Sequence, residues 1–254
     1  MLRPVKACEI FGLKTLMGAL MQQFKVMVVA AAMALASCAT ANRVETMSGG
    51  APPPDNATII VVAPDIQLAI MTASGVQEPR ADWSDQARTN IAASIAARLQ
   101  QEGHTAVAFE PEDAMEGRSG QLLRLHEAVA GSILMVHYTP FMPLPTKEDT
   151  FEWSLGDGVQ EIAANSTAPE ARYALFLFAR GSYASGGRIA AVAIGAALGV
   201  GMPMGGQDMY VSLVDLETGD IVWFNVARAG ADADMREAAG ARTLVNSILE
   251  SAPL

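Results

Sequence analysis

Strand-like and helix-like hydrophobic patterns alternate along most of this chain. Continuous apolar runs rich in β-branched or aromatic side chains predict buried strands, and apolar positions three or four residues apart predict helices. The expected strands are residues 58–62, 105–109, 132–138, 173–179, 209–216 and 220–226. The expected helices are residues 82–101, 122–131, 159–164 and 234–251. This order predicts an α/β fold: a single domain with a mixed, mostly buried β-sheet flanked by helices.

Two parts of the sheet are specified more closely by their sequences. Residues 173–179 (YALFLFA) are apolar on both faces, which predicts a strand in the centre of the sheet. The strands 209–216 and 220–226 are separated by a short polar stretch that contains Gly219. Because glycine accepts the positive φ angle of a tight turn, these two strands are expected to form a hairpin.

The N-terminal residues have the pattern of an export signal. Lys25 precedes a nine-residue apolar run, 26–34, which ends in the sequence Leu-Ala-Ser-Cys at 35–38. A positive residue, a short apolar segment and small residues describe a secretory signal, and nine residues are too few to span a bilayer. Residues 1–37 are therefore expected to be a signal peptide. Glu9 is atypical of such a leader, so the true start is expected at Met17 or Met21.

The Leu-Ala-Ser-Cys sequence resembles the lipobox of bacterial lipoproteins. The resemblance implies cleavage before Cys38 and acyl chains on its sulfur, which would make the membrane a partner. Residue 39 is not the aspartate that commonly signals retention in the inner membrane, which favours the outer membrane. Residues 38–56 would then be the lipidated cysteine and a flexible tether, holding the domain off the membrane, and 57–254 a periplasmic domain. The alternatives are an ordinary signal peptide and a one-pass anchor.

The charge of the chain excludes some partners. The formal net charge is −10, and the first 37 residues hold four of the 17 basic and one of the 27 acidic residues. The mature chain would therefore be more acidic, which argues against nucleic acid or anionic headgroups as partners. Cys8 falls in the leader and Cys38 would be acylated, so no thiol is expected for a disulfide or a metal.

An uncharged segment from Ile189 to Met204 is the most unusual stretch of the chain. Its 16 residues would form a helix of about 24 Å, against a hydrocarbon core of about 30 Å, and Pro203 shortens it further. A helix that is apolar all round must be covered on every side. Packing inside the fold, contact with another chain (self-association included) and membrane insertion or pore formation all remain open. The candidate interface residues are Ile189, Val192, Gly195, Leu198 and Gly199.

Candidate nucleophiles and metal ligands do not form a recognisable pattern. Ser182 and Ser185 follow the expected central strand but do not match Gly-x-Ser-x-Gly, and they could cap the apolar helix instead. His104, His126 and His137 lack metal-ligand spacing.

Acidic clusters and the glycine-rich stretch 199–205 are also weak signals. The acidic residues are at expected loop-to-helix joins, where they complement the helix dipole: Glu110, Glu112, Asp113, Asp232 and Asp234. The calcium-loop pattern stops after two aspartates, and the glycines do not have dinucleotide-binding spacing. No catalytic residue, metal or cofactor is therefore expected.

The element order is similar to that of periplasmic domains of outer-membrane lipoproteins, including curli secretion-channel subunits and activators of penicillin-binding proteins. It also resembles the N-terminal domain of the Tol-system propeller protein. The local match is residues 214–223 (VDLETGDIVW), of the form D-x-x-T-G-x-x-V-W. The resemblance implies a non-enzymatic binding or assembly module of the cell envelope, with envelope proteins or further copies as partners. The alternatives are a channel-forming oligomer and an envelope serine hydrolase that uses Ser182 or Ser185.

Overall fold

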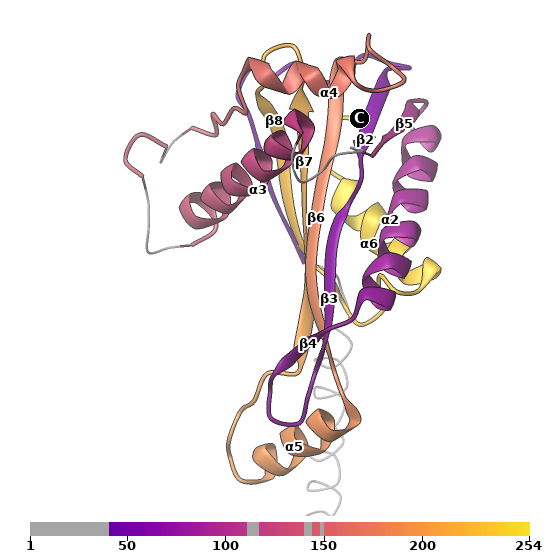
Figure 1. The fold of residues 1–254 in the computed structure, drawn as a ribbon. Coiled ribbons are helices and arrows are strands. Elements are labelled where there is room, and N and C mark those ends of the chain that lie inside the picture. The colour runs from indigo at the N-terminus through magenta and orange to yellow at the C-terminus, as the bar shows by residue number, and fades with distance from the viewer. Residues whose placement is uncertain (1–40, 111–116, 140–143, 148–149) are drawn as a thin grey trace, which may run out of the picture. The chain divides into compact units, whose positions relative to one another are not determined.

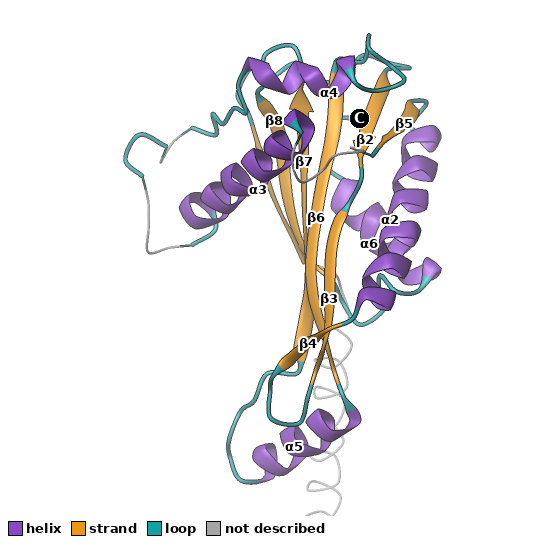
Figure 2. Ribbon diagram, viewed as in Figure 1, coloured by secondary structure: helices purple, strands orange, loops and turns teal. Residues whose placement is uncertain are grey.

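The computed structural model describes residues 41–110, 117–139, 144–147 and 150–254. Those residues form one mixed sheet with helices on both of its faces, which confirms the predicted α/β class (Figures 1 and 2). The strands are β1 (Ala41–Thr46), β2 (Thr58–Val62), β3 (Asp65–Met71), β4 (Gln77–Pro79), β5 (Thr105–Phe109), β6 (Tyr173–Ala184), β7 (Gly205–Asp215) and β8 (Ile221–Arg228). The helices are α2 (Ala81–Gln101), α3 (Arg118–His137), α4 (Gln160–Ala164), α5 (Gly186–Ala197) and α6 (Ala238–Leu249).

Strand β6 is the centre of the sheet, as its sequence predicts. The strand order is β1-β8-β7-β6-β2-β5, and β3 continues from β2 along the same edge of β6. The strand is interrupted between β2 and β3 at Ala63 and Pro64, because proline lacks the N–H that a continuous ladder of hydrogen bonds needs. Alternate residues of the strands enter two separate cores. One core holds α2 and α6, and the other holds α3 and α4.

Helix α3 replaces a helix and a strand that the sequence pattern predicts. The sequence predicts a strand at residues 132–138 after a stop at Gly131, but α3 continues through Gly131 to His137 without interruption. The buried positions Leu122, His126, Ala130 and Ile133 continue at helical spacing. Residues 132–138 are a short apolar run, and a short run does not by itself distinguish a buried strand from a helix.

The expected flexible tether is partly folded. Residues 41–46 form β1, which pairs with β8 along its whole length. Farther along, Pro53 is buried, and the Tyr173 hydroxyl donates to the backbone oxygen of Ala51 at 3.2 Å. The domain therefore begins at β1 rather than at residue 57. Cys38 itself lies outside the described residues.

Strands β3, β4, β6 and β7 extend beyond the layers of α2, α6 and α3 and form an arm (Figure 2). Helix α5 connects β6 to β7 at the end of this arm, next to the β3–β4 turn (Figure 1). Neither β3 nor β4 was predicted, although β3 alternates exposed and buried residues over its first four positions.

The β7–β8 hairpin is confirmed, and its motif residues have structural roles. The Asp215 carboxylate is buried, accepts from the Arg172 guanidinium at 2.7 Å, and accepts from the Glu217 backbone N–H at 2.9 Å. Gly219 has a φ of +80°, and a Cβ there would lie 2.5 Å from the Gly156 oxygen. The turn therefore requires glycine both for its backbone angle and for its close approach to a neighbouring loop.

Two glycine substitutions test this description with opposite outcomes. Gly131→Ala is expected to raise the free energy of unfolding by roughly 0.5–1 kcal/mol, because Gly131 lies inside α3 with open space around it. Gly219→Ala is expected to lower it by roughly 1–3 kcal/mol through left-handed strain and the clash with Gly156. Urea unfolding followed by circular dichroism measures both. A destabilised Gly131→Ala would contradict the continuous helix.

Candidate functional site

The end of the arm has no exposed charge. We call residues 72–76 and 185–206, which form the β3–β4 turn, α5 and the loop after it, the arm tip. Its one charged residue is Arg188, which is buried. The Arg188 guanidinium donates to the backbone oxygen of Pro203 at 2.8 and 3.0 Å and to that of Ala73 at 3.5 Å. Arg188 thus joins the three parts of the arm tip while its charge is shielded from solvent.

Both ends of α5 are capped. The Ser185 hydroxyl accepts from the Arg188 backbone N–H at 3.1 Å, as an N-cap serine does. At the other end the Val200 N–H donates to the Gly195 oxygen and the Gly199 N–H to the Ala196 oxygen, with Gly199 at a φ of +76°. This is a Schellman motif. The apolar segment therefore ends its helix by local backbone hydrogen bonds, within 12 residues.

The arm tip exposes apolar side chains, so the apolar segment is not part of either core. Leu198 is 75 % exposed, Ile194 64 % and Val200 54 %. Other large apolar side chains near half exposure or above are Val76, Ile189 and Met204. Exposed apolar side chains gathered in this way are typical of a surface that contacts another molecule. Internal packing is thereby excluded, and two of the three explanations for the segment remain.

The five candidate interface residues differ in their positions. Ile189, Leu198 and Gly199 are exposed, and Val192 is half-buried. Gly195 is buried, because a Cβ there would lie 2.5 Å from the Met202 methyl group of the same arm tip. The most exposed apolar side chains are therefore Ile194 of α5 and Leu198 just after it, and Gly195 is covered by the loop that follows the helix.

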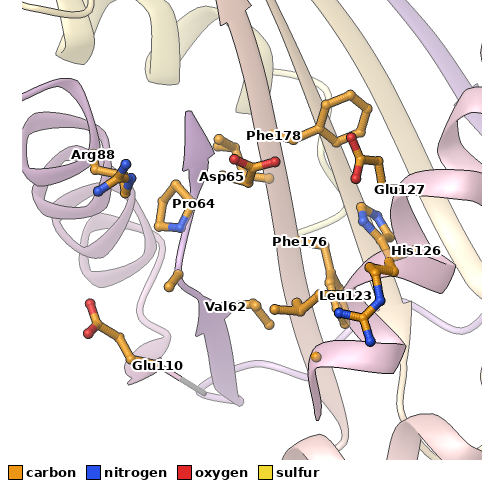
Figure 3. A pocket seen from close by; sticks show the side chains of 14 residues that line it. Val62, Pro64, Asp65, Arg88, Glu110, Leu123, His126, Glu127, Phe176 and Phe178 are labelled. Atoms are coloured by element: carbon orange, nitrogen blue, oxygen red, sulfur yellow. The ribbon is translucent and has the colours of Figure 1, made fainter. Parts of the chain in front are cut away.

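A crevice of about 520 Å³ lies at the carboxyl end of β2. The chain passes through α2 to β5, which pairs with one edge of β2. It then passes through α3 to β6, which pairs with the other edge of β2, so the order of the strands reverses at β2. Ligands of open α/β sheets bind at such switch points. Figure 3 shows side chains from α2, α3 and the strands around this space, including Arg88, Glu110, Glu127 and Phe178. The sequence pattern did not reveal this crevice, because the strand 132–138 that it predicted does not exist.

The charged groups beside the crevice are largely paired with one another. Arg180 binds the Asp65 carboxylate at 2.6 Å and that of Glu127 at 3.0 Å. Arg88 binds Asp85 at 2.7 Å. Among the described residues around it, the crevice therefore has no unbalanced cluster of one charge that would select an ionic ligand.

A buried His–Ser pair lies at the wall of the crevice, which His126 helps to line. His126 Nε2 is 2.8 Å from the Ser212 hydroxyl, and its ring stacks on Phe176 with centroids 4.5 Å apart (Figure 3 shows His126 and Phe176). Ser212 is 0 % exposed, so no substrate reaches it. Burial lowers the pKa of His126 from 6.5 to about 3, which keeps the imidazole neutral. The pair is a core hydrogen bond, which the spacing of the histidines could not indicate.

The remaining candidate residues do not converge on one site. Ser185 caps α5, Ser182 is buried in β6, and His137 accepts from the Trp153 indole N–H at 3.0 Å. His104 is buried at the start of β5. Glu112 and Asp113 lie outside the described residues. Within the described part of the chain, no group of three His, Cys, Asp or Glu side chains could hold a metal ion.

Asp234 belongs to a cluster that attaches the loop before α6 to the sheet. The Tyr183 hydroxyl lies 2.7 Å from Asp234 Oδ1, and the Arg236 guanidinium stacks on the Tyr183 ring and on Trp83. Burial raises the pKa of Tyr183, and the hydrogen bond to Asp234 adds to this effect. Burial alone would raise the pKa of Asp234, but hydrogen bonds from Arg236 and Tyr183 hold that pKa below its usual value. The acidic residue therefore has a structural role here.

Helices long and apolar enough to cross a bilayer are not found among the described residues.

No protein-family model matches the chain, and no curated protein sequence does. Among solved structures, a PelC dodecamer from Paraburkholderia phytofirmans is similar, with 14% identity over 84% of this chain and 98% of that chain, and a TM-score of 0.37. A point variant of the PelC dodecamer from the same organism gives 15% identity, coverage of 85% and 97%, and a TM-score of 0.35. A likeness at these scores is too distant to transfer an assembly or an activity.

The buried His126 predicts a stability that depends on pH. Its pKa is lowered in the folded state, so the free energy of unfolding is highest above pH 6.5 and falls as pH falls toward 3. Between pH 7 and pH 5 this group alone is expected to remove about 2 kcal/mol. Urea unfolding at both pH values measures the loss, which His126→Gln should abolish. Ser212→Ala should keep it, because burial rather than the hydrogen bond is its cause. An unchanged loss in His126→Gln would contradict the assignment.

Proposed function

We propose that this protein is a lipid-anchored binding or assembly module of the bacterial envelope, without enzymatic activity. Acyl chains on Cys38 would hold it at the outer membrane, with the α/β domain facing the periplasm. The observation that supports this proposal best is the position of β1 relative to the arm tip. The strand begins at the end of the sheet from which the arm extends.

The strand register defines that position. Ala41, the first residue of β1, lies opposite Arg228 of β8, and Arg228 lies opposite Asp208 of β7. From Asp208 the arm continues toward Gly205 and α5. The first residue of β1 therefore lies at the end of the ladder from which the arm extends. An anchor at Cys38 and the apolar arm tip would both face the surface of the same membrane.

The rest of the fold supports binding rather than catalysis. The serine that follows β6 is a helix cap, and the described histidines are bound within the structure or buried. The crevice at the end of β2 is a second place where a partner or small ligand could bind, since its size is typical of ligand pockets. The serine-hydrolase alternative has no such observation in its favour.

Replacement of the two cysteines tests the anchor. Cells expressing the full chain with Cys38→Ala should incorporate no radiolabelled palmitate into it, and the protein should leave the membrane fraction. Cys8→Ala is the matched control, because Cys8 falls in the expected leader, and it should behave as wild type. Incorporation of palmitate into Cys38→Ala, or its loss from Cys8→Ala, would contradict the proposal.

A further inference from the structure

We propose that the arm tip inserts into the lipid bilayer that holds the anchor, so that lipid rather than a second protein covers α5. This inference rests on acylation of Cys38, the proposed function above. It adds a second membrane contact, made by the folded domain itself. It follows from the reach of the chain, from the length of the arm and from the chemistry of the arm tip.

The chain between the anchor and the sheet is short. Cys38 is three residues before Ala41, and three extended residues span about 10 Å at most. Because residues 41–46 are paired with β8, they cannot lengthen this connection. The covalent reach of the chain would therefore keep an acylated sulfur at residue 38 within about 10 Å of the level of Arg228 and Asp208, plus the length of its own side chain.

The arm is at least as long as that connection. From Asp208 to Gly205, β7 advances three residues, or about 10 Å. Helix α5 lies beyond Gly205 at the end of the arm (Figure 1). Even a fully stretched connection directed along the arm brings Cys38 only about level with Gly205. If the arm points toward the bilayer, the arm tip would therefore reach the membrane surface when acyl chains on Cys38 are inserted.

The chemistry of the arm tip fits the interface of a bilayer. It exposes Ile194, Leu198 and Val200 and no charge, since the guanidinium of Arg188 is hydrogen-bonded and buried. The Ser185 hydroxyl caps the Arg188 N–H at the start of the helix, and the Schellman motif binds the carbonyls of Gly195 and Ala196 near its end. A helix of 12 residues is about 18 Å long, which suits a position in the interface and not a crossing.

Charged residues set a limit on the depth of insertion. Asp208 pairs with Arg228 at 2.8 Å where the arm leaves the sheet, and Glu78 is exposed on β4. These groups would remain in the aqueous phase, because charge in hydrocarbon is costly. The exposed apolar side chains lie in the part of the arm beyond them, so the insertion is shallow.

Single cysteines with an environment-sensitive label test the contact. The processed, acylated chain would have no other thiol, so Leu198→Cys can be labelled with nitrobenzoxadiazole (NBD) in the purified full protein. Met135→Cys is the matched control, because Met135 is half exposed on α3, away from the arm. In phosphatidylcholine vesicles the label at 198 should show about a twofold rise in emission and quenching by doxyl-labelled lipid, because its site becomes apolar. The label at 135 should show neither change.

The outcomes separate this inference from the proposed function. Protein that floats with vesicles while its label at 198 stays water-like and unquenched would overturn the inference and leave the anchor intact. Protein that is not acylated and does not float would refute the proposed function itself. A disulfide between two Leu198→Cys copies without lipid quenching would show that a second copy covers the arm tip, which also overturns the inference. The label can also be attached to Ile194→Cys. Adding Leu198→Ser to that variant should leave its circular dichroism spectrum unchanged but reduce the quenching of the label by doxyl-labelled lipid.

Discussion

The pairing of β6 along both of its edges is the constraint on which the rest of the structure depends. Over 12 residues this strand bonds β7 on one edge, and β2 followed by β3 on the other. Its first half lies between the two helical cores and its second half forms the arm. The break at Ala63 and Pro64, where β2 gives way to β3, is also where the crevice opens. One strand therefore positions both candidate surfaces.

The sequence predicted the regular, buried part of this fold and failed at its extremities. Residues 173–179 gave a correct central strand, because burial on both faces leaves an unambiguous apolar run. The continuation of β6 through Arg180, Gly181 and Ser182 has the composition of a loop, so the length of the strand could not be seen. The arm was therefore missed. Where a strand ends decides whether the helix after it is covered or exposed.

The apolar segment illustrates the same limit. Its composition indicated a helix that is apolar on every side, and the structure has a 12-residue helix with exposed apolar side chains. What the pattern could not provide was the position of that helix in the fold, since position depends on the ladder that leads to it. Likewise, the motif at 214–223 was noticed as a resemblance, but the reason for it is the Asp215 carboxylate and the contact of Gly219 with Gly156.

Strand β1 also determines how the domain responds to mechanical force. Its six residues pair with β8 in an antiparallel ladder, whose hydrogen bonds are perpendicular to the strands. A pull on the residues before Ala41, directed along β1, loads these bonds in shear, so that they share the tension together instead of opening one after another. The attachment of β1 to the sheet is therefore stronger against a pull along β1 than against a pull that peels β1 away from β8.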